Sequence, residues 1–256
     1  MGLREVALRA GVSISTVSRV LNGSSTVNVE LTDRVLKAAQ ELQYQPNIAG
    51  RNLRMQIDPE FGPDFSERKS EHISEKRMIA RLAARSCPQG AVIALDSGSS
   101  VAELAAYIPE SAIVYTNSFA PIQTLARRGI ATYLAPGLYI PAMGAVFGPD
   151  TEEYFRSHPV SYYFLSSARI DVHTGLYNVN PLTIGVKATL LRHSQVTVLL
   201  VDHHKFVDVH LKSYSPLSDI DILVTDVVPD EYRELLAQKI PVIIEAVSAN
   251  CNQEDA

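Results

Sequence analysis

The chain of 256 residues is poor in cysteine: it has only Cys87 and Cys251, and their spacing matches no metal-binding motif. We therefore expect two free thiols and no structural disulfide. No apolar run reaches the roughly 20 residues that a membrane-spanning helix needs. The first residues, MGLREVALRAG, have no apolar segment typical of a secretory signal. Internal repeats and low-complexity tracts are also missing. Together these absences predict a globular protein of the cytoplasm.

Charge is distributed unevenly along the chain. Residues 1–56 contain seven Lys or Arg against four Asp or Glu, a net charge of +3, while the whole chain has −5. The remaining 200 residues therefore carry −8. A small basic module on an acidic body is how many DNA-binding regulators are built.

Residues 3–54 show only helical patterns. Apolar residues recur at helical spacing over 3–10 and again over 29–42, and Asn47 can cap a short fourth helix that runs to Leu53. Between the first two patterns, Gly11-Val12 predicts a turn, and Ser13 is a natural N-cap for a helix that runs to about residue 21.

That second helix is rich in Ser and Thr, which are poor residues for a helix interior. A short helix, a turn with glycine and a second helix with small polar side chains form the helix-turn-helix pattern. The second helix of this motif enters the major groove of DNA, where hydroxyls bond phosphates and bases and Arg19 can reach a guanine. A plain three-helix bundle that binds a protein partner is the alternative.

Several motifs in this stretch have family-like spacing: AGVS, TVSRVLN, RV-x-x-AA-x-EL-x-Y-x-PN and R-x-L-R. With them, residues 3–54 resemble the DNA-binding domain of the LacI family of repressors. The resemblance implies that Leu53 lies on a hinge helix and wedges into the minor groove, which kinks the duplex. Base reading is implied for Ile14, Ser15 and Arg19. Backbone or hinge contacts with DNA are expected from Ser13, Thr16, Ser18, Asn22, Asn47 and Arg51.

The sequence pattern changes at residue 56. Residues 56–72 contain prolines, a glycine and many charges without periodicity, which predicts a linker between a DNA-binding domain at 1–55 and a second domain at 73–256. From residue 73 on, helical patterns alternate with short apolar runs at 91–96, 112–116, 131–135, 161–165, 196–201, 221–225 and 241–245. This alternation predicts an α/β domain with a mostly parallel sheet and helices on both faces.

The second domain resembles the C-terminal sensor domain of DeoR-type regulators rather than a LacI-type sensor. The segments that carry the resemblance are SEKRMIARLAARSCPQGAVIALDSGSSVAELA, IVYTNS, GVKATLL, VLLVDHHKF and PLSDIDILVTD, in this order over residues 73–226. It implies a fold of the ribose-phosphate-isomerase type and a sugar-phosphate effector. The chain thus joins a LacI-type head to a DeoR-type sensor.

The residues themselves also point to a small anionic ligand. The run Asp96-Ser97-Gly98-Ser99-Ser100 follows a predicted strand and opens a helix, where backbone N–H groups and hydroxyls suit a phosphate. Carboxyl ends of parallel strands form the usual ligand edge of such a sheet. Further effector residues are expected at Thr116, Asn117, Lys187, Asp202 and Lys205. Three histidines, His203, His204 and His210, lack the companions of a metal site, and we expect neither metal nor cofactor.

These patterns predict a transcriptional regulator, most simply a repressor, that binds a palindromic operator as a homodimer or homotetramer and responds to a phosphorylated sugar. Two alternatives remain. In one, the second domain is a sugar-phosphate isomerase fused to a DNA-binding head, although the absence of acidic residues at 182–185, which read Leu-Thr-Ile-Gly, counts against proton transfer. In the other, a degenerate sensor serves only for oligomerisation.

Overall fold

The computed structural model describes residues 3–21, 28–42, 64–178, 180–209 and 213–246. The chain divides into two compact units, Met1–Ile57 and Asp58–Ala256, each of which is described by itself. Within the described ranges, no helix is both long enough and apolar enough to cross a bilayer.

The first unit is a small helical head. It contains α1 (Leu3–Ala10), α2 (Ile14–Leu21) and α3 (Val29–Glu41). Val6, Val17 and Val35, one from each helix, are fully buried and form its core together with alanines. The N–H of Thr16 donates to Ser13 Oγ at 3.1 Å, so that Ser13 caps α2. The expected hinge helix around residues 47–53 lies outside the described residues.

The turn between α1 and α2 needs a glycine. Gly11 has φ +64°, in the left-handed region that costs little only for glycine. A Cβ at this position would lie 2.8 Å from Nη2 of Arg34. That same Nη2 donates to the carbonyl of Ala10 at 2.6 Å, so that Arg34 of α3 fixes the turn between α1 and α2.

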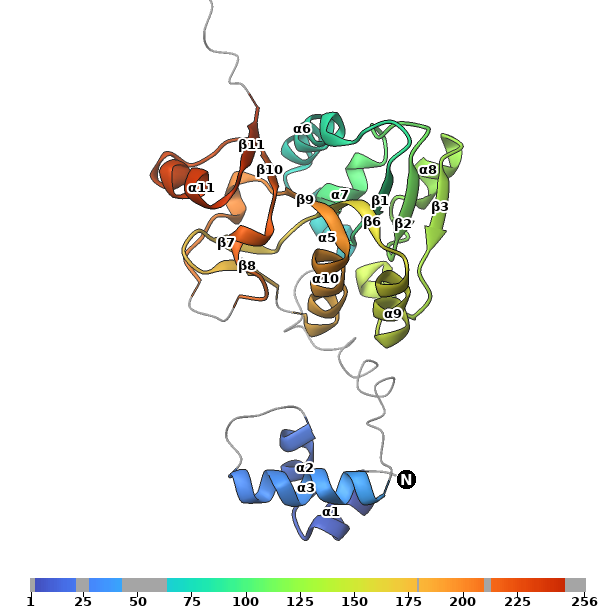
Figure 1. Cartoon of the computed structure of the whole chain (residues 1–256), viewed down its shortest axis with the longest axis vertical. Helices are drawn as coiled ribbons and strands as arrows, with labels where there is room; N and C mark the ends of the chain where they lie inside the picture. The colour runs from blue at the N-terminus through green and yellow to red at the C-terminus, as the bar shows by residue number, and fades with distance from the viewer. Residues whose placement is uncertain (1–2, 22–27, 43–63, 179, 210–212, 247–256) are drawn as a thin grey trace, which may run out of the picture. The chain divides into compact units, whose positions relative to one another are not determined.

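The second unit is built on a sheet of seven parallel strands, ordered β11-β10-β9-β6-β1-β2-β3 (Figure 1). Its strands are β1 (Val92–Leu95), β2 (Ile113–Thr116), β3 (Ala131–Leu134), β6 (Val160–Leu165), β9 (Ser194–Leu200), β10 (Ile222–Thr225) and β11 (Val242–Glu245). Each of the seven apolar runs in the sequence supplies one strand. The prediction of an α/β domain with a parallel sheet is therefore confirmed.

Helices cover both faces of this sheet. One core contains Ile79, Leu104 and Leu125, from α6 (Ile73–Ala83), α7 (Ser99–Leu104) and α8 (Ile122–Arg127). The opposite core includes side chains from α9 (Pro149–Ser157), α10 (Pro181–His193) and α11 (Arg233–Lys239). Neighbouring residues of a strand point to opposite faces, so Leu199 enters the second core and Val198 the first.

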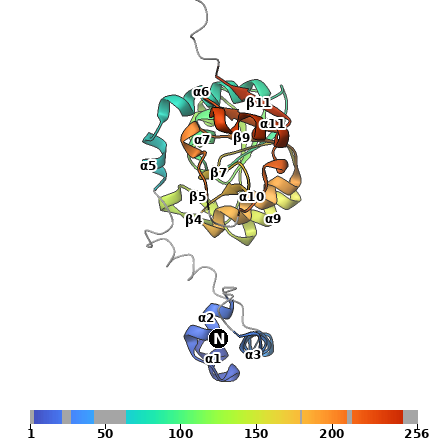
Figure 2. The same cartoon turned by 90° about the vertical axis from the view of Figure 1, so that its left-hand side faces the viewer.

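Elements without a clear signal in the sequence also appear. Two short antiparallel hairpins, β4 (Leu138–Ile140) with β5 (Ala145–Phe147) and β7 (Arg169–Asp171) with β8 (Gly175–Tyr177), stand apart from the main sheet. Residues 56–72 were expected to be a linker, and the part of them that the structure describes contains α5 (Phe65–Ser70). Figure 2 shows α5 on the same side of the unit as the β4–β5 hairpin.

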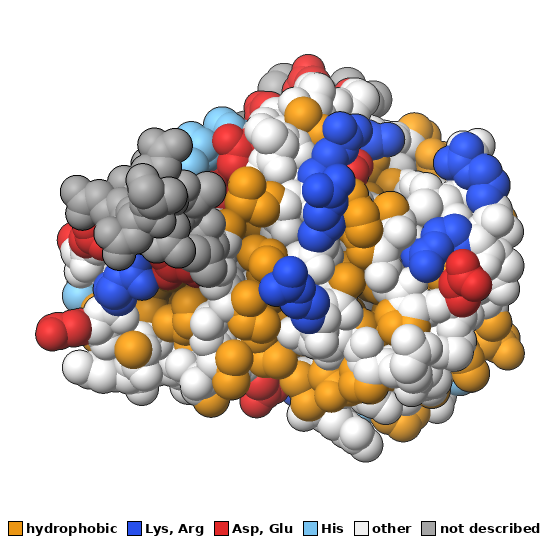
Figure 3. Space-filling model, turned by 90° about the horizontal axis from the view of Figure 1, so that it is seen from above, with side chains coloured by type: hydrophobic (Ala, Val, Ile, Leu, Met, Phe, Trp, Pro, Cys, Tyr) orange, Lys and Arg blue, Asp and Glu red, His pale blue; other side chains and the backbone are white. Residues whose placement is uncertain are grey.

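Helix α6 is amphipathic. Ile79 and Ala80 are buried against the sheet, whereas Arg77 and Arg81 are exposed, with Arg85 four residues further on. Figure 3, which views the chain from above, shows basic side chains in a row between apolar patches. Arg77 pairs with Glu103 at 3.4 Å, and the Arg81 guanidinium lies over the Tyr107 ring. Two of the charges on this outer face, Arg77 and Arg81, therefore have partners.

The turn gives a first prediction. Gly11→Ala should destabilise the head by about 1–2 kcal/mol, because alanine is strained at this φ and its methyl group meets Arg34. Faster hydrogen exchange of the α1 and α2 amides would measure the loss. Gly90→Ala is the control: Gly90 has φ +71° but open space around it, and it lies in the other unit. Unchanged exchange in Gly11→Ala would contradict the role given to the turn.

Candidate functional site

The order of the strands reverses direction at one place in the sheet. From β1 the chain moves outward through β2 to β3, then returns to β6 on the other side of β1 and continues through β9 to β11. β1 and β6 are neighbours, with Ile93 opposite Tyr162. In open parallel sheets, ligands bind outside the carboxyl ends of strands at such a switch point. Residues that follow β1 and β6 are therefore the first candidates.

Asp96, which follows β1, is the centre of a buried polar cluster. Its Oδ1 accepts from the N–H of Gly98 at 2.7 Å, and its Oδ2 accepts from the N–H of Ser166 at 3.0 Å. Oδ2 also pairs with Nζ of Lys187, which donates in addition to the carbonyl of Ser166 at 2.7 Å. The Asp96 and Lys187 side chains are only 2% and 4% exposed. One carboxylate thus joins β1, β6 and α10.

Glycine is required at position 98. A Cβ on Gly98 would lie 1.8 Å from Oγ of Ser166 and 2.8 Å from its Cβ. The backbone of the loop after β1 therefore contacts a side chain of the loop after β6. Such close approach leaves no room for any side chain at this position.

The loop after β2 adds a second set of polar groups. Oγ1 of Thr116 donates to the carbonyl of Leu95 at 2.8 Å and accepts from the N–H of Ser118 at 3.0 Å. Nδ2 of Asn117 donates to the carbonyl of Val146 at 2.9 Å. Oδ1 of Asn117 is buried and has no hydrogen-bond partner among the described residues.

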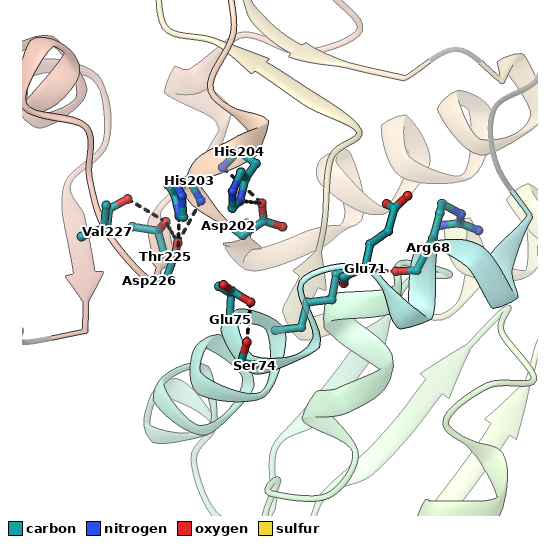
Figure 4. A network of polar contacts seen from close by, with 11 residues as sticks. Arg68, Glu71, Ser74, Glu75, Asp202, His203, His204, Thr225, Asp226 and Val227 are labelled. Carbon is teal, nitrogen blue, oxygen red and sulfur yellow. Dashed lines mark hydrogen bonds and ion pairs between the residues drawn. The ribbon is translucent and has the colours of Figure 1, made fainter.

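Asp202 and the residues after it extend the cluster beyond β9. Asp202 Oδ1 accepts from the N–H of His204 at 3.2 Å, and its Oδ2 is buried without a hydrogen-bond partner in the described part of the chain. His203 follows Asp202, and its Nδ1 lies 2.5 Å from Oδ2 of Asp226, which follows β10 (Figure 4). Burial alone would raise the pKa of Asp226, but hydrogen bonds from His203 outweigh it and lower the pKa.

Tyr163 places a neutral hydroxyl near the same cluster. Its side chain, on β6, is fully buried, and its hydroxyl has no hydrogen-bond partner among the described residues. Burial raises the pKa of Tyr163 well above that of a free tyrosine, and the charge of Asp96 adds to the effect. The phenol therefore stays protonated and can donate to an oxygen.

Helix α5 approaches this cluster from the part of the chain expected to be a linker. Nζ of Lys76, on α6, donates to the carbonyls of Arg68 and Glu71 at the end of α5, the latter at 2.5 Å. Lys76 is only 2% exposed. Burial lowers the pKa of the Arg68 guanidinium, and the negative charges of Asp96, Asp64 and Glu71 oppose this shift. Figure 4 shows Arg68 and Glu71 to the right of Asp202 and the histidines.

The histidines bind the corner between α5 and α6 to the loop after β9. The ring of His72 stacks on that of His204 with centroids 3.9 Å apart, and His204 in turn lies 3.8 Å from His203. His72 has φ +48°, which is unusual for a residue other than glycine. Within the described ranges, no three His, Cys, Asp or Glu side chains are arranged to hold a metal ion.

The structure brings most of the expected effector residues to one edge of the sheet. Nine of the ten are buried, and Lys205 is half-buried. The buried set comprises Asp96, Ser97, Gly98, Ser99, Ser100, Thr116, Asn117, Lys187 and Asp202. Lys187, one of the expected effector residues, has its charge paired with Asp96.

Sequence reasoning missed Tyr163, Ser166, Lys76 and Arg68. One signal was available: Lys76 has helical spacing with the buried residues Ile79, Ala80 and Ala83, and a charged residue on an apolar face needs a partner. The others depend on contacts between distant segments.

In the head, Ser13, Ile14 and Thr16 lie exposed or half-buried at the start of α2, with the Ser13 and Thr16 hydroxyls 2.8 Å apart. Ser15, Ser18 and Arg19 are in the same helix. The remaining expected contacts, Asn22, Asn47, Arg51 and Leu53, lie outside the described residues.

Comparison with known families covers both units. The model of the DeoR C terminal sensor domain matches residues 71–227. The chain belongs to this family. A second model, bacterial regulatory proteins of the lacI family, matches residues 2–47. Both resemblances inferred from the sequence are thereby confirmed.

Relatives match most of this DeoR-sensor protein. The uncharacterized HTH-type transcriptional regulator YulB of Bacillus subtilis is 27% identical over 86% of this chain and 84% of its own length. The L-fucose operon activator of Escherichia coli is 26% identical over 78% of this chain and 87% of its own length. Among solved structures, ribose 5-phosphate isomerase from Plasmodium falciparum covers 52% of this chain and 53% of its own, with a TM-score of 0.38 and 13% identity.

The buried ion pair gives a second prediction. Lys187→Met should destabilise the protein by about 3–5 kcal/mol, because it leaves the Asp96 carboxylate buried without its cation. The double variant Asp96→Asn, Lys187→Met should recover part of this loss, since it removes both charges. Urea unfolding of the full chain measures each. Lys69→Met, at an exposed position, is the control. A loss in Lys187→Met no larger than in the control would refute the pair's structural role.

Proposed function

We propose that this protein is a transcriptional regulator whose affinity for DNA changes when a phosphorylated sugar binds its sensor unit. The observation that carries the proposal is the combination of two matches in one chain, a lacI-type head at 2–47 and a DeoR-type sensor at 71–227. A reading head alone would bind DNA constitutively, and a sensor alone would have nothing to control. The two together make a ligand-controlled DNA-binding protein.

The start of α2 supports the DNA-binding half. In a helix-turn-helix, the N-terminal residues of the second helix face the base edges. Here those residues are Ser13, Ile14 and Thr16, which combine two hydroxyls with an apolar side chain that is 48% exposed. We propose base contacts for Ile14, Ser15 and Arg19 and phosphate contacts for their neighbours. A dimer or tetramer on a palindromic operator suits such a head, because two-fold sites match two-fold proteins.

The polar edge of the sheet supports the sensing half. Asp96, Asn117 and Asp202 offer carboxylate and amide oxygens to sugar hydroxyls. The name of one relative, the L-fucose operon activator, links a regulator to a sugar operon. Relatives over most of the chain are named as regulators, which favours this function over an isomerase. We expect DNA binding to repress transcription. A reporter gene placed behind an operator selected from random DNA measures whether expression falls or rises.

Base reading gives a third prediction. After an operator is selected from random DNA, Arg19→Ala should lose about 1–3 kcal/mol of binding free energy on it and relax the preference at one base pair. Lys37→Ala, which removes the same charge from an exposed position of α3, is the control. Electrophoretic or fluorescence titration at fixed salt measures both. Equal losses on operator and random DNA would contradict base reading by Arg19.

Sensing gives a fourth prediction. A sugar phosphate at about 100 times its dissociation constant should stabilise the sensor unit by about 2.7 kcal/mol, whereas the free sugar should stabilise it less. Thermal unfolding of the full chain with ribose 5-phosphate, fructose 6-phosphate and glucose 6-phosphate, each beside its free sugar, measures the shift. If no phosphorylated sugar of a wider panel raises the midpoint, the sensor serves another purpose, such as oligomerisation.

A further inference from the structure

One part of the sensor unit is nearly free of charge. From residue 111 to residue 149 the only charged residues are Arg127 and Arg128, whereas 20% of the whole chain is charged. Arg128 directs its guanidinium inward, because Nη1 donates to the carbonyl of Ala105 at 2.9 Å and Nη2 to that of Ile108 at 2.7 Å. This stretch contains β2, β3, β4 and β5. It therefore offers little to a partner such as DNA that is bound through charge.

The same stretch carries most of the large apolar side chains that the described part of the sensor exposes. They are Ile113, Phe119, Tyr133, Leu134 and Tyr139. Tyr133 is 51% exposed, and its ring stacks on that of Tyr115 with centroids 4.8 Å apart. Depletion of charge together with aromatic side chains is the composition of the core of a protein–protein interface. We therefore expect another protein surface to cover part of this stretch.

β3 lies at one edge of the seven-stranded sheet (Figure 1). The N–H of Ala135, just after β3, donates to the carbonyl of Thr116 on β2 at 2.8 Å. Because the backbone groups of successive residues in a strand point to alternate sides, those of Thr132 and Leu134 point away from β2. Among the described strands, none continues the sheet on that side of β3. The N–H and C=O groups of these two residues thus form a row with which another strand can pair.

The two edges of the sheet differ in their protection. β11, at the other edge, follows Pro241 and ends at Glu245, whose carboxylate pairs with Arg233 at 2.7 Å. Proline and charged side chains are common means by which an edge strand avoids pairing with another chain. Residues 130–135, which include β3, contain neither. An apolar edge without such protection favours aggregation unless a specific partner covers it.

We propose that β3 pairs in antiparallel orientation with β3 of a second copy of this chain, around a two-fold axis that passes between the two Tyr133 residues. In this register Thr132 of each copy lies opposite Leu134 of the other. Both residues point their N–H and C=O groups outward, so they exchange the hydrogen bonds of an antiparallel pair. An uncharged edge is complementary to itself, since two copies meet without repulsion between like charges.

The same register places the two Tyr133 side chains opposite each other. They form a non-hydrogen-bonded pair, in which side chains approach most closely. Each ring, half exposed in one copy, is then covered by the other while its stack on Tyr115 is kept. The pairing supplies the two-fold symmetry that a protein on a palindromic operator needs. The inference itself rests on the surface of the sensor and not on the proposed function.

Light scattering after size-exclusion chromatography of the full chain tests the pairing. The wild type should have at least twice the mass of the 28.1 kDa chain. Thr132→Pro should halve the wild-type mass, because it removes an outward N–H group without breaking a bond to β2. Thermal melting shows whether this variant is folded.

A charge swap tests the register. Tyr133→Lys and Tyr133→Glu should each halve the wild-type mass, since two like charges then face each other across the two-fold axis. An equimolar mixture of the two variants should recover the mass, because each lysine then meets a glutamate, and this recovery also shows that both variants fold. Val242→Lys places the same charge at an exposed position of the opposite edge strand and should keep the wild-type mass.

A wild type that is monomeric at micromolar concentration would overturn the inference. So would folded Thr132→Pro and Tyr133 variants that keep the wild-type mass, or a loss of mass in Val242→Lys equal to that in Tyr133→Lys. A mixture of Tyr133→Lys and Tyr133→Glu that stays at half the mass, with both variants folded, would overturn the register centred on Tyr133. These results leave the proposed function intact, because binding of operator and sugar phosphate tests it separately.

Discussion

The ion pair between Asp96 and Lys187 is the interaction on which the sensor unit depends. It is almost completely buried, and such a pair is tolerated only when other hydrogen bonds satisfy both partners. Here the N–H groups of Gly98 and Ser166 and the carbonyl of Ser166 do so. The pair therefore fixes the loops after β1 and β6 and the middle of α10 in one arrangement. Those same loops follow β1 and β6 at the switch point of the sheet, so fold and candidate site share their central contact.

Separate apolar cores in the two units explain how a head of one family and a sensor of another can stand in one chain. The head buries Val6, Val17 and Val35 among its own three helices, and the sensor buries its sheet between two layers of its own helices. Among the described residues, the cores of each unit contain side chains of that unit alone. Units that bury their own apolar surface can be combined by joining their ends. The function of the combined protein then depends on how the connecting segment couples the two units.

Helix α5 lies where that connection enters the sensor. A buried lysine, Lys76, holds its last carbonyls, and a stack of imidazoles holds the corner that follows. Both anchors are polar, and both involve residues that neighbour the candidate site. The apolar cores of the sensor include no described residue of this helix.

The sequence by itself determined the local elements and the nature of both units. Alternating apolar runs specified all seven strands of the sheet, since a buried parallel strand is apolar on both faces. The motifs around α2 and the segments of residues 73–226 specified the two families. Positions such as Asp96, Asn117 and Asp202 were found because they follow strands, and the carboxyl ends of parallel strands share one edge.

Only the tertiary structure decided which of these residues act on one another. The order of the strands made β1 and β6 neighbours, and the fold paired Asp96 with Lys187, 91 residues away. It also formed α5 within a stretch whose prolines and charges predict a linker, because Lys76 binds the end of that helix from another element. Local patterns encode periodicity and turns, whereas contacts between distant segments follow from packing and charge compensation in the complete fold.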